Sequence, residues 1–573
     1  MATPADYTSA GFQEAVAAIV EQKTYNWIFD INASFLLTSG YLVFMMQLGF
    51  ALLTIGAVQA KSVKSVCLKN LMDVCAGGVG YFLFGYAFAY GDPQSCDSSG
   101  VCSSTGNPFI GSQMFALHDL SEDSYQTYYF QFVFAVSTAT IVSGAVAERV
   151  KFIAYGLYAL FLTIWVYPVL THWLWSASGW ASATRTTGPL LIGSGAYDTV
   201  GSGAVHAVGG WAGLAGALVA GPRLGRFDKN GKPRPMPGHN SVFYISGALL
   251  LWYGFYGFNP GTMGMIIASD GSNFANVVGR CAMSTTMGAC FGGCTGLLVM
   301  LIYTRLTTGH AMWDLTMSTN GALTGMVVIT SGCATYEPWA SALGGIVGGL
   351  LVLPGSLFVL HVLKVDDPVD AVTVHAFGGT AGVLFYSLMA SKNYVYELYG
   401  ATNSWDGGPR HYGWFRGDTP HTFAANVIWV CVIFGWTMGM MYPFFWVLNK
   451  FGKLRISREE EMAGVDVSKH GGHAYPGMED VYNVELRHMA GDDVMTDVPD
   501  HKFHGSSGVD YPGSHSSKLQ SQIDHLKAEM ARLVALVLTL LSAGALEGRL
   551  QVLKCTLATS VDNKRSIKTK FHH

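Results

Sequence analysis

The chain contains two copies of the phrase VHAxGGxAG, at residues 205–213 and 374–382. Each copy lies in an apolar run long enough to cross a bilayer, where an ionisable side chain is costly and marks a substrate path. On a helix, each histidine shares one face with the glycines three, four and seven residues later. Two helices with such glycine faces can approach closely, so we predict that His206 and His375 lie side by side.

A buried histidine on an apolar helix is more often a packed core residue than a functional one. Recurrence of the same phrase in both halves of the chain favours function, because internal repeats commonly build midplane sites in transporters. A metalloenzyme is disfavoured because neither histidine belongs to an HxxH motif or has carboxylate companions. We therefore expect no metal, no cofactor and no enzymatic activity.

The composition is that of a membrane protein. Half of the 573 residues are hydrophobic and only 13% are charged, whereas soluble domains carry about 25%. The net charge of -4 and the absence of a Lys/Arg-rich tract argue against a nucleic-acid partner. Cys96 and Cys102 form a candidate local disulfide if their loop is extracellular.

Apolar windows of about 20 residues predict an all-α polytopic fold with eleven transmembrane helices. The predicted spans are 33–58, 69–90, 127–147, 152–175, 200–221, 242–264, 276–303, 311–333, 337–361, 371–390 and 421–448.

The basic residues of the short loops predict the orientation. They gather in the odd-numbered loops, whereas the 91–126 loop has no Lys or Arg and is acidic. This asymmetry puts the N-terminus outside and the C-terminus in the cytoplasm. His206 then lies on the inward-running fifth span and His375 on the outward-running tenth span. Two sets of five spans with opposite sense form an inverted repeat, with one extra helix.

Polar and aromatic residues surround the predicted path on its outer side. Asp198 stands eight residues before His206, where it can cap a helix or add negative field to an outer vestibule, and the two roles are compatible. Aromatic residues on nearby spans suit either an interfacial belt or a cage for a small cation. The segment 257–262 breaks a helix and is expected to line the entrance.

Several phrases resemble the Amt/Mep/Rh ammonium transporter superfamily, in its eukaryotic Amt branch. They occur in order over residues 25–477 and are AERVKF (147–152), HWLWS (172–176), YDTVGSGAVHAVGG (197–210), YGFNPGT (256–262), ITSGCA (329–334) and DDPVDAVTVHAFGG (366–379). The resemblance implies an eleven-helix homotrimer in the plasma membrane, surrounded by membrane lipid. Its substrate would be ammonium or ammonia, moved through a pore in each subunit.

The resemblance also implies roles for single residues. His206 and His375 match the family's twin histidines, and Asp198 matches its pore-mouth aspartate. The match extends to an ammonium recruitment site of Trp175, Phe134 and Thr262 and to an aromatic gate of Phe134 and Phe258. Thr262 departs from the usual serine but keeps the hydroxyl, so we expect altered affinity.

Ammonium and potassium are similar in size, but only ammonium can lose a proton and cross an apolar constriction as a neutral molecule. We expect deprotonation near the outer site, with passage of ammonia and a proton along the histidine pair. One alternative is an electroneutral ammonia channel of the Rh type, which Trp175 and Asp198 disfavour. Another is an ammonium sensor on the same fold.

The remaining segments complete the predicted organisation. Residues 1–32 form an extracellular segment, 33–448 the transporter domain, and 449–477 resemble the family's regulatory tail, which docks under a neighbouring subunit. In this tail Ser468 matches a hydroxyl that a kinase can phosphorylate. Residues 478–515 are predicted as a flexible linker, 516–545 as a coiled coil from their heptad spacing, and 546–573 as a polar tail.

Overall fold

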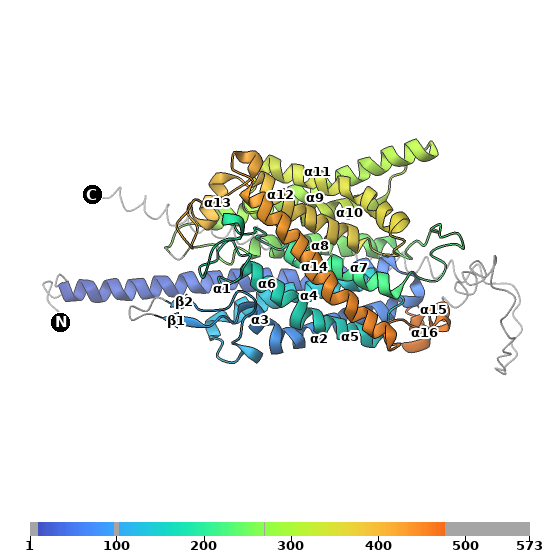
Figure 1. Cartoon of the computed structure of the whole chain (residues 1–573), viewed down its shortest axis with the longest axis horizontal. Coiled ribbons are helices and arrows are strands. Elements are labelled where there is room, and N and C mark those ends of the chain that lie inside the picture. The colour runs from blue at the N-terminus through green and yellow to red at the C-terminus, as the bar shows by residue number, and fades with distance from the viewer. Residues whose placement is uncertain (1–9, 97–101, 269, 476–573) are drawn as a thin grey trace, which may run out of the picture. The chain divides into compact units, whose positions relative to one another are not determined.

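Long helices make up most of the chain in the computed structural model, which describes residues 10–96, 102–268 and 270–475 (Figure 1). Helices occupy all eleven predicted spans. They are α1 (Ala10–Ala57), α2 (Val63–Gly80) with η3 (Tyr81–Gly85) and α3 (Tyr86–Tyr90), α4 (Tyr125–Ala145), α5 (Phe152–Phe161) with η6 (Leu162–Val166) and α6 (Tyr167–Trp175), η8 (Ser202–Ala207) with α7 (Val208–Ala220), α8 (Ser241–Gly261), α9 (Ala275–Thr308), α10 (Leu315–Thr330), α11 (Pro338–Leu357) with η9 (Phe358–Val362), η10 (Val372–Phe377) with α12 (Gly378–Met389), and α14 (His421–Lys450).

The connecting segments contain only short elements. A two-stranded antiparallel hairpin joins β1 (Gln94–Cys96) and β2 (Cys102–Ser104). One further helix, α13 (Lys392–Tyr399), precedes α14, and α15 (Arg458–Ala463) and α16 (Val465–Lys469) follow it. Single helical turns are η2 (Ala60–Ser62), η4 (Phe115–Leu117), η5 (Glu122–Ser124), η7 (Leu191–Gly193) and η11 (Trp414–Arg416).

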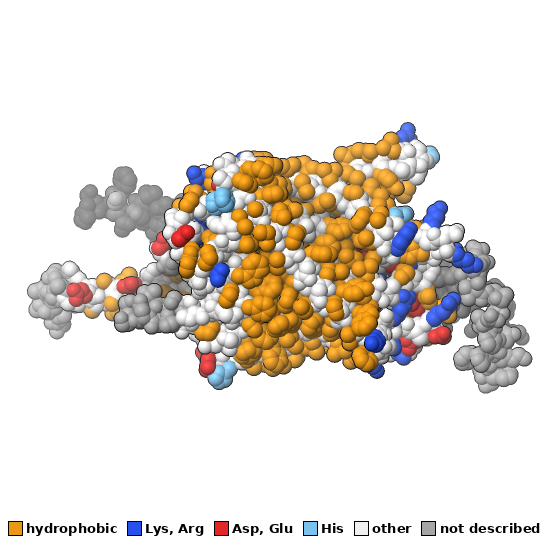
Figure 2. Space-filling view, viewed as in Figure 1, with side chains coloured by type: hydrophobic (Ala, Val, Ile, Leu, Met, Phe, Trp, Pro, Cys, Tyr) orange, Lys and Arg blue, Asp and Glu red, His pale blue; other side chains and the backbone are white. Residues whose placement is uncertain are grey.

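Nine helical segments among the described residues are long and apolar enough to cross a membrane. The helices α4 and α10 lie at the third and eighth predicted spans but are not among these nine; α10 has only 16 residues. Apolar side chains form a broad band in Figure 2, and Lys and Arg gather beyond one edge of it. The all-α polytopic membrane fold predicted from the sequence is therefore confirmed.

The first helix begins earlier than the sequence predicts. The helix α1 begins at Ala10 rather than near residue 33, so most of the segment predicted to precede the membrane is helical. Residues 10–32 contain no proline and are rich in Ala, Glu and Gln, which favour helix whether or not the sequence is apolar. A window of about 20 residues locates one membrane-spanning stretch but does not register how far the same helix continues beyond it.

The two helices that carry the repeated histidines lie at the centre of the bundle. In Ser202–Ala220 and Val372–Met389, 83% and 67% of the most apolar window is buried, against 33% in α9 and 28% in α14. Each histidine lies on a π-helical turn, η8 or η10, which leads directly into a glycine-rich α-helix. The sequence phrase thus predicted the position of both histidines, whereas the π geometry was not predicted.

Glycines bring these two helices into direct backbone contact. A Cβ atom added to Gly210 would lie 2.2 Å from the backbone nitrogen of Ala376, and one added to Gly379 would lie 2.2 Å from the carbonyl oxygen of Ser202. Real Cβ atoms do not approach backbone this closely, so no other residue fits here without a shift. The close approach predicted from the glycine faces is confirmed.

We predict that Gly210→Ala destabilises the protein by about 1–3 kcal/mol, because its methyl group would overlap the backbone of the partner helix. The matched control is Gly435→Ala on α14, where nothing lies within 4 Å of an added Cβ. The control should be neutral or slightly stabilising, because alanine favours helix more than glycine does. Thermal unfolding of the detergent-solubilised protein measures the stability of both variants. Equal midpoint temperatures for the two would contradict the close backbone contact between the two histidine helices.

Candidate functional site

The two repeated histidines face each other in the interior. Their Nδ1 atoms are 3.2 Å apart, and their rings stack with centroids 5.3 Å apart and planes 14° apart. His206 is 1% exposed and His375 is 8% exposed. Because both partners are ring nitrogens, one must donate and the other must accept, and a change of tautomer in the pair moves the proton. Among the described residues, His206 Nε2 has no hydrogen-bond partner, so this nitrogen is free to bind a small polar guest.

Aromatic rings cover His206 on one side. Phe134 and Phe258, the predicted gate pair, stack with centroids 4.0 Å apart and planes 13° apart. Phe258 also lies 5.3 Å from the ring of His206, and Phe255 stacks on that imidazole at 5.5 Å. The predicted aromatic pair and the predicted histidine pair thus form one continuous stack of rings.

The residues predicted for the outer site lie around Phe134. The ring of Trp175 is 6.4 Å from that of Phe134 and meets it edge-on, and Trp175 Nε1 donates to the carbonyl oxygen of Asp198 at 2.9 Å. Thr262 lies one helical turn beyond Phe258, and its hydroxyl donates to the Phe258 carbonyl at 2.7 Å. Phe134 therefore contacts both Trp175 and Phe258, while the Thr262 hydroxyl is used within its own helix.

Asp198 caps the helix that carries His206. Its side chain is 2% exposed and accepts hydrogen bonds from the backbone N–H groups of Gly203 at 2.8 Å and Ala204 at 2.9 Å. These N–H groups begin η8 and would otherwise have no helical partner. The capping interpretation of Asp198 therefore fits its geometry.

Asp367 repeats this arrangement in the second half of the chain. It stands eight residues before His375, as Asp198 stands eight before His206. Its carboxylate accepts from the N–H group of Val372, at the start of η10, at 2.7 Å and from that of Val369, in the preceding loop, at 3.3 Å. No role was predicted for Asp367, although the equal spacing of the two aspartates was visible in the sequence.

A narrow cavity lies against His375 on the side away from the aromatic stack. It is mainly apolar, and the side chains of Phe50, Thr54, Ile141, Leu251, Val369 and Val374 contribute to its walls. Phe50 lies 6.3 Å from the imidazole of His375 between ring centroids. The rings and the cavity together outline a mostly apolar path past the histidine pair.

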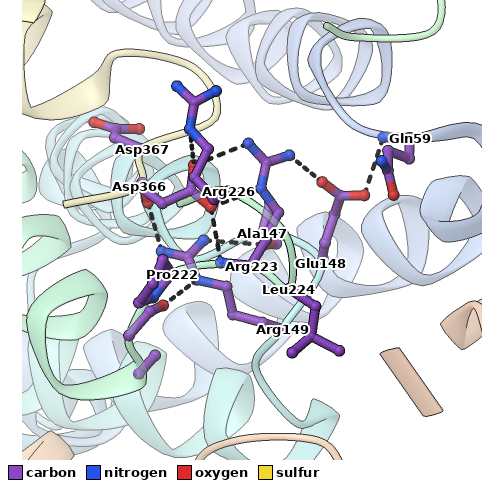
Figure 3. A network of polar contacts seen from close by, with 12 residues as sticks. Gln59, Ala147, Glu148, Arg149, Pro222, Arg223, Leu224, Arg226, Asp366 and Asp367 are labelled. Carbon is purple, nitrogen blue, oxygen red and sulfur yellow. Dashed lines mark hydrogen bonds and ion pairs between the residues drawn. The ribbon is translucent and has the colours of Figure 1, made fainter. Parts of the chain in front are cut away.

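A buried ion-pair network joins the ends of the two histidine helices on the predicted cytoplasmic side (Figure 3). Arg223, just after α7, donates to both carboxylate oxygens of Asp366 at 2.8 and 3.0 Å and pairs with Glu148. Arg149 donates to the Asp366 carbonyl at 2.6 Å, and Arg226 lies 3.3 Å from the same carboxylate. Burial opposes ionisation of Asp366, but the hydrogen bonds and charge of Arg223 hold its pKa well below the usual range.

The tail that contains Ser468 packs against loops of its own chain. Arg455 donates to the carbonyls of Ala220 and Pro222 at the end of α7. Farther along, the Asp466 carboxylate accepts from the N–H groups of Lys64 and Ser65, both at 2.9 Å, at the start of α2. Docking under a neighbouring subunit stays a prediction.

Ser468 is exposed on α16, where its hydroxyl donates to the Gly464 carbonyl at 3.0 Å.

The β1–β2 register pairs Cys96 with Cys102, as a local disulfide requires, but the side chains of these two residues lie outside the described part. The described residues contain no group of three or more His, Cys, Asp or Glu side chains that could hold a metal ion.

Comparison with known proteins agrees with the sequence resemblance. The profile of the Ammonium Transporter Family matches residues 33–475. The chain belongs to this family. It is 43% identical over 464 residues to ammonium transporter 1 member 3 of Solanum lycopersicum, covering 80% of this chain and 95% of that protein. It is 44% identical over 465 residues to ammonium transporter 1 member 1 of Oryza sativa subsp. japonica, covering 80% and 87%.

Solved structures share the fold of this ammonium transporter. A structure described as Sensor Amt Protein aligns with a TM-score of 0.65 and 28% identity, over 78% of this chain and 99% of that chain. Candida albicans Mep2 aligns with a TM-score of 0.63 and 25% identity, over 82% and 93%. These likenesses confirm the predicted superfamily in its eukaryotic Amt branch, whose members are transporters rather than enzymes.

We predict that Asp366→Asn destabilises the protein by about 3 kcal/mol, because removing one partner of a buried ion pair leaves the other charge poorly compensated. The control is Asp119→Asn, whose side chain is 84% exposed; it should change stability by less than about 0.5 kcal/mol. The comparison uses thermal or denaturant unfolding of the purified transporter. A loss for Asp366→Asn no larger than that for the control would show that the network does not stabilise the fold.

Proposed function

We propose that this ammonium transporter recruits ammonium at Trp175, Phe134 and Thr262, removes its proton near the Phe134–Phe258 pair, and passes ammonia and the proton along His206 and His375. The observation that carries this proposal is the buried pair of imidazoles, 3.2 Å apart, covered directly by stacked aromatic rings. In this proposal, the guest passes these rings before it reaches the Nε2 of His206.

The apolar path explains selectivity. A cation that keeps its charge loses hydration in the narrow cavity beyond His375 and gains little from its mostly apolar walls. Ammonium escapes this penalty by giving up a proton, whereas potassium cannot. The histidine pair offers that proton a route, since a tautomer change transfers it from one ring to the other.

We also propose the transmembrane architecture and the orientation of the chain. We infer eleven transmembrane helices in a five-plus-five inverted repeat with one extra helix, because both histidines lie on π turns capped by an aspartate eight residues upstream. We further infer a homotrimer in the plasma membrane, with the N-terminus outside and the C-terminus in the cytoplasm. The basic residues at one edge of the apolar band support this orientation (Figure 2).

Electrogenic transport is favoured over an electroneutral ammonia channel of the Rh type. The favouring observation is the pair of Trp175 and Asp198, in which the indole donates to the backbone carbonyl of Asp198, so that an aromatic ring and an acidic residue lie together where a cation would enter. Ammonium-evoked current in a membrane that lacks endogenous transporters distinguishes the two, because a neutral channel carries no current.

We predict that Asp198→Ala abolishes ammonium current, because η8 loses its cap and the outer site loses its negative charge. His206→Asp and His375→Glu should keep some current but reject potassium less well, since an acidic side chain stabilises a charged guest. Asp123→Ala, on the predicted outer surface, serves as the control and should behave as the unsubstituted protein. Full current with unaltered selectivity in all three pore variants would contradict the proposed path.

The tail is proposed to regulate the pore. Residues 454–475 contact the ends of α7 and α2 through Arg455 and Asp466. A phosphate on Ser468 would add almost two negative charges on the same short helix as Asp466 and weaken that contact by repulsion. A kinase would then be a partner. The predicted linker 478–515, coiled coil 516–545 and polar tail 546–573 lie outside the described residues.

We predict that Ser468→Asp lowers ammonium current roughly tenfold, which corresponds to a shift of about 1.4 kcal/mol in the docking equilibrium. Ser468→Ala should leave the current intact. Co-expression of the aspartate variant with unsubstituted subunits measures whether the tail of one subunit affects the pores of the others. Current that falls more steeply than the unsubstituted fraction supports joint closure of the three pores, and a proportional fall rules it out.

A further inference from the structure

A second carboxylate lies beside the path at the end predicted to face the cytoplasm. Asp370 belongs to the loop that leads into η10, and its neighbours Val369 and Ala371 both line the cavity against His375. Its carboxylate Oδ2 accepts a hydrogen bond from Asn320 Nδ2 at 3.1 Å. Leu323, one turn along α10 from Asn320, also lines that cavity. The carboxylate therefore stands where the apolar path ends.

The surroundings of Asp370 are polar but mostly enclosed. Asn320 is 1% exposed, and its Oδ1 accepts from the hydroxyl of Tyr244 at 2.7 Å. The titratable and charged groups that face Asp370 are Asp367 on its own loop, Arg226 after α7 and Tyr244 on α8. Beyond the apolar cavity, the site thus combines two carboxylates, Asp370 and Asp367, with the Asn320 amide, the Tyr244 phenol and the nearby charge of Arg226.

Both protonation states of Asp370 are accessible near neutral pH. Burial and the negative charge of Asp367 raise the pKa of Asp370 to about 7, against the hydrogen bond from Asn320 and the charge of Arg226. Because the pKa is raised, the carboxyl group is protonated below about pH 7 and ionised above it. A group with a pKa close to the working pH is suited to donate and to regain a proton.

We propose that Asp370 returns a proton to ammonia as it leaves the apolar cavity. This step rests on the proposed function. The carboxyl O–H bond breaks and an N–H bond forms on ammonia, which gives ammonium and a carboxylate. The carboxylate binds the new cation until it enters water, and it then takes a proton from the cytoplasmic solution. The path thus ends in a binding site for ammonium.

The test is Asp370→Asn, measured as ammonium current with the pH controlled on the cytoplasmic side. Asp370 has a backbone φ of 57°, a conformation that asparagine and glycine tolerate well, so Asp370→Asn and Asp370→Gly should both fold. We expect the maximal current of each to fall roughly tenfold with little change in the external ammonium concentration for half-maximal current. In the unsubstituted protein, current should decline as cytoplasmic pH rises from about 6 to about 8, and this decline should be absent in both variants.

Asp228→Asn provides the matched control, because the Asp228 carboxylate accepts hydrogen bonds from the backbone N–H groups of Asn230 and Lys232 within its own 221–240 loop. It should keep the current and its pH profile. Asp370→Glu, which retains a carboxyl group, should restore part of the pH profile. Normal current and an unchanged pH profile in Asp370→Asn would overturn the inference, as would an equal loss at every cytoplasmic pH, the mark of a merely structural role. Failure of the proposed function is distinguishable, since the unsubstituted protein would then carry no ammonium current.

Discussion

Backbone contact between two glycine-rich helices is the constraint on which the rest of the structure depends. Gly210 and Gly379 leave room for the opposing main chain, and no side chain fits in the space between them. This contact brings two imidazoles within 3.2 Å in the centre of an apolar bundle. The stacked rings of Phe134 and Phe258 and the narrow cavity can flank the pair only because it is held there.

The two helices also need fixed ends, and buried charges supply them. Asp198 and Asp367 bind the first N–H groups of η8 and η10. At the same end of the bundle as Asp367, Arg223 joins the segment after α7 to the segment before η10 through Asp366. Arg455 of the tail contacts the same end of α7. A displacement of the tail therefore reaches the two histidine helices through one short chain of hydrogen bonds and ion pairs.

The features predicted from the sequence were those with local periodicity. The repeated phrase located both histidines and their glycine faces, because residues three, four and seven apart share a helix face. Apolar windows located the spans but not the beginning of α1, which has 48 residues and is much longer than one such window. The ion-pair network was not predicted, because Glu148, Arg223 and Asp366 lie in three distant loops. Nor was the position of Asp370, which depends on contacts with α8 and α10.

The number of residues between each aspartate and its histidine limits which sequence changes this chain can tolerate. The two intervals, DTVGSGAVH and DPVDAVTVH, share their length and the valines at 200 and 205 and at 369 and 374, while most other positions differ. A π turn contains one residue more than an α turn of the same span, and losing one residue would rotate the cap by about 100° relative to the histidine. The two intervals therefore differ in side chains but share the length that places each aspartate at the start of the π turn that carries its histidine.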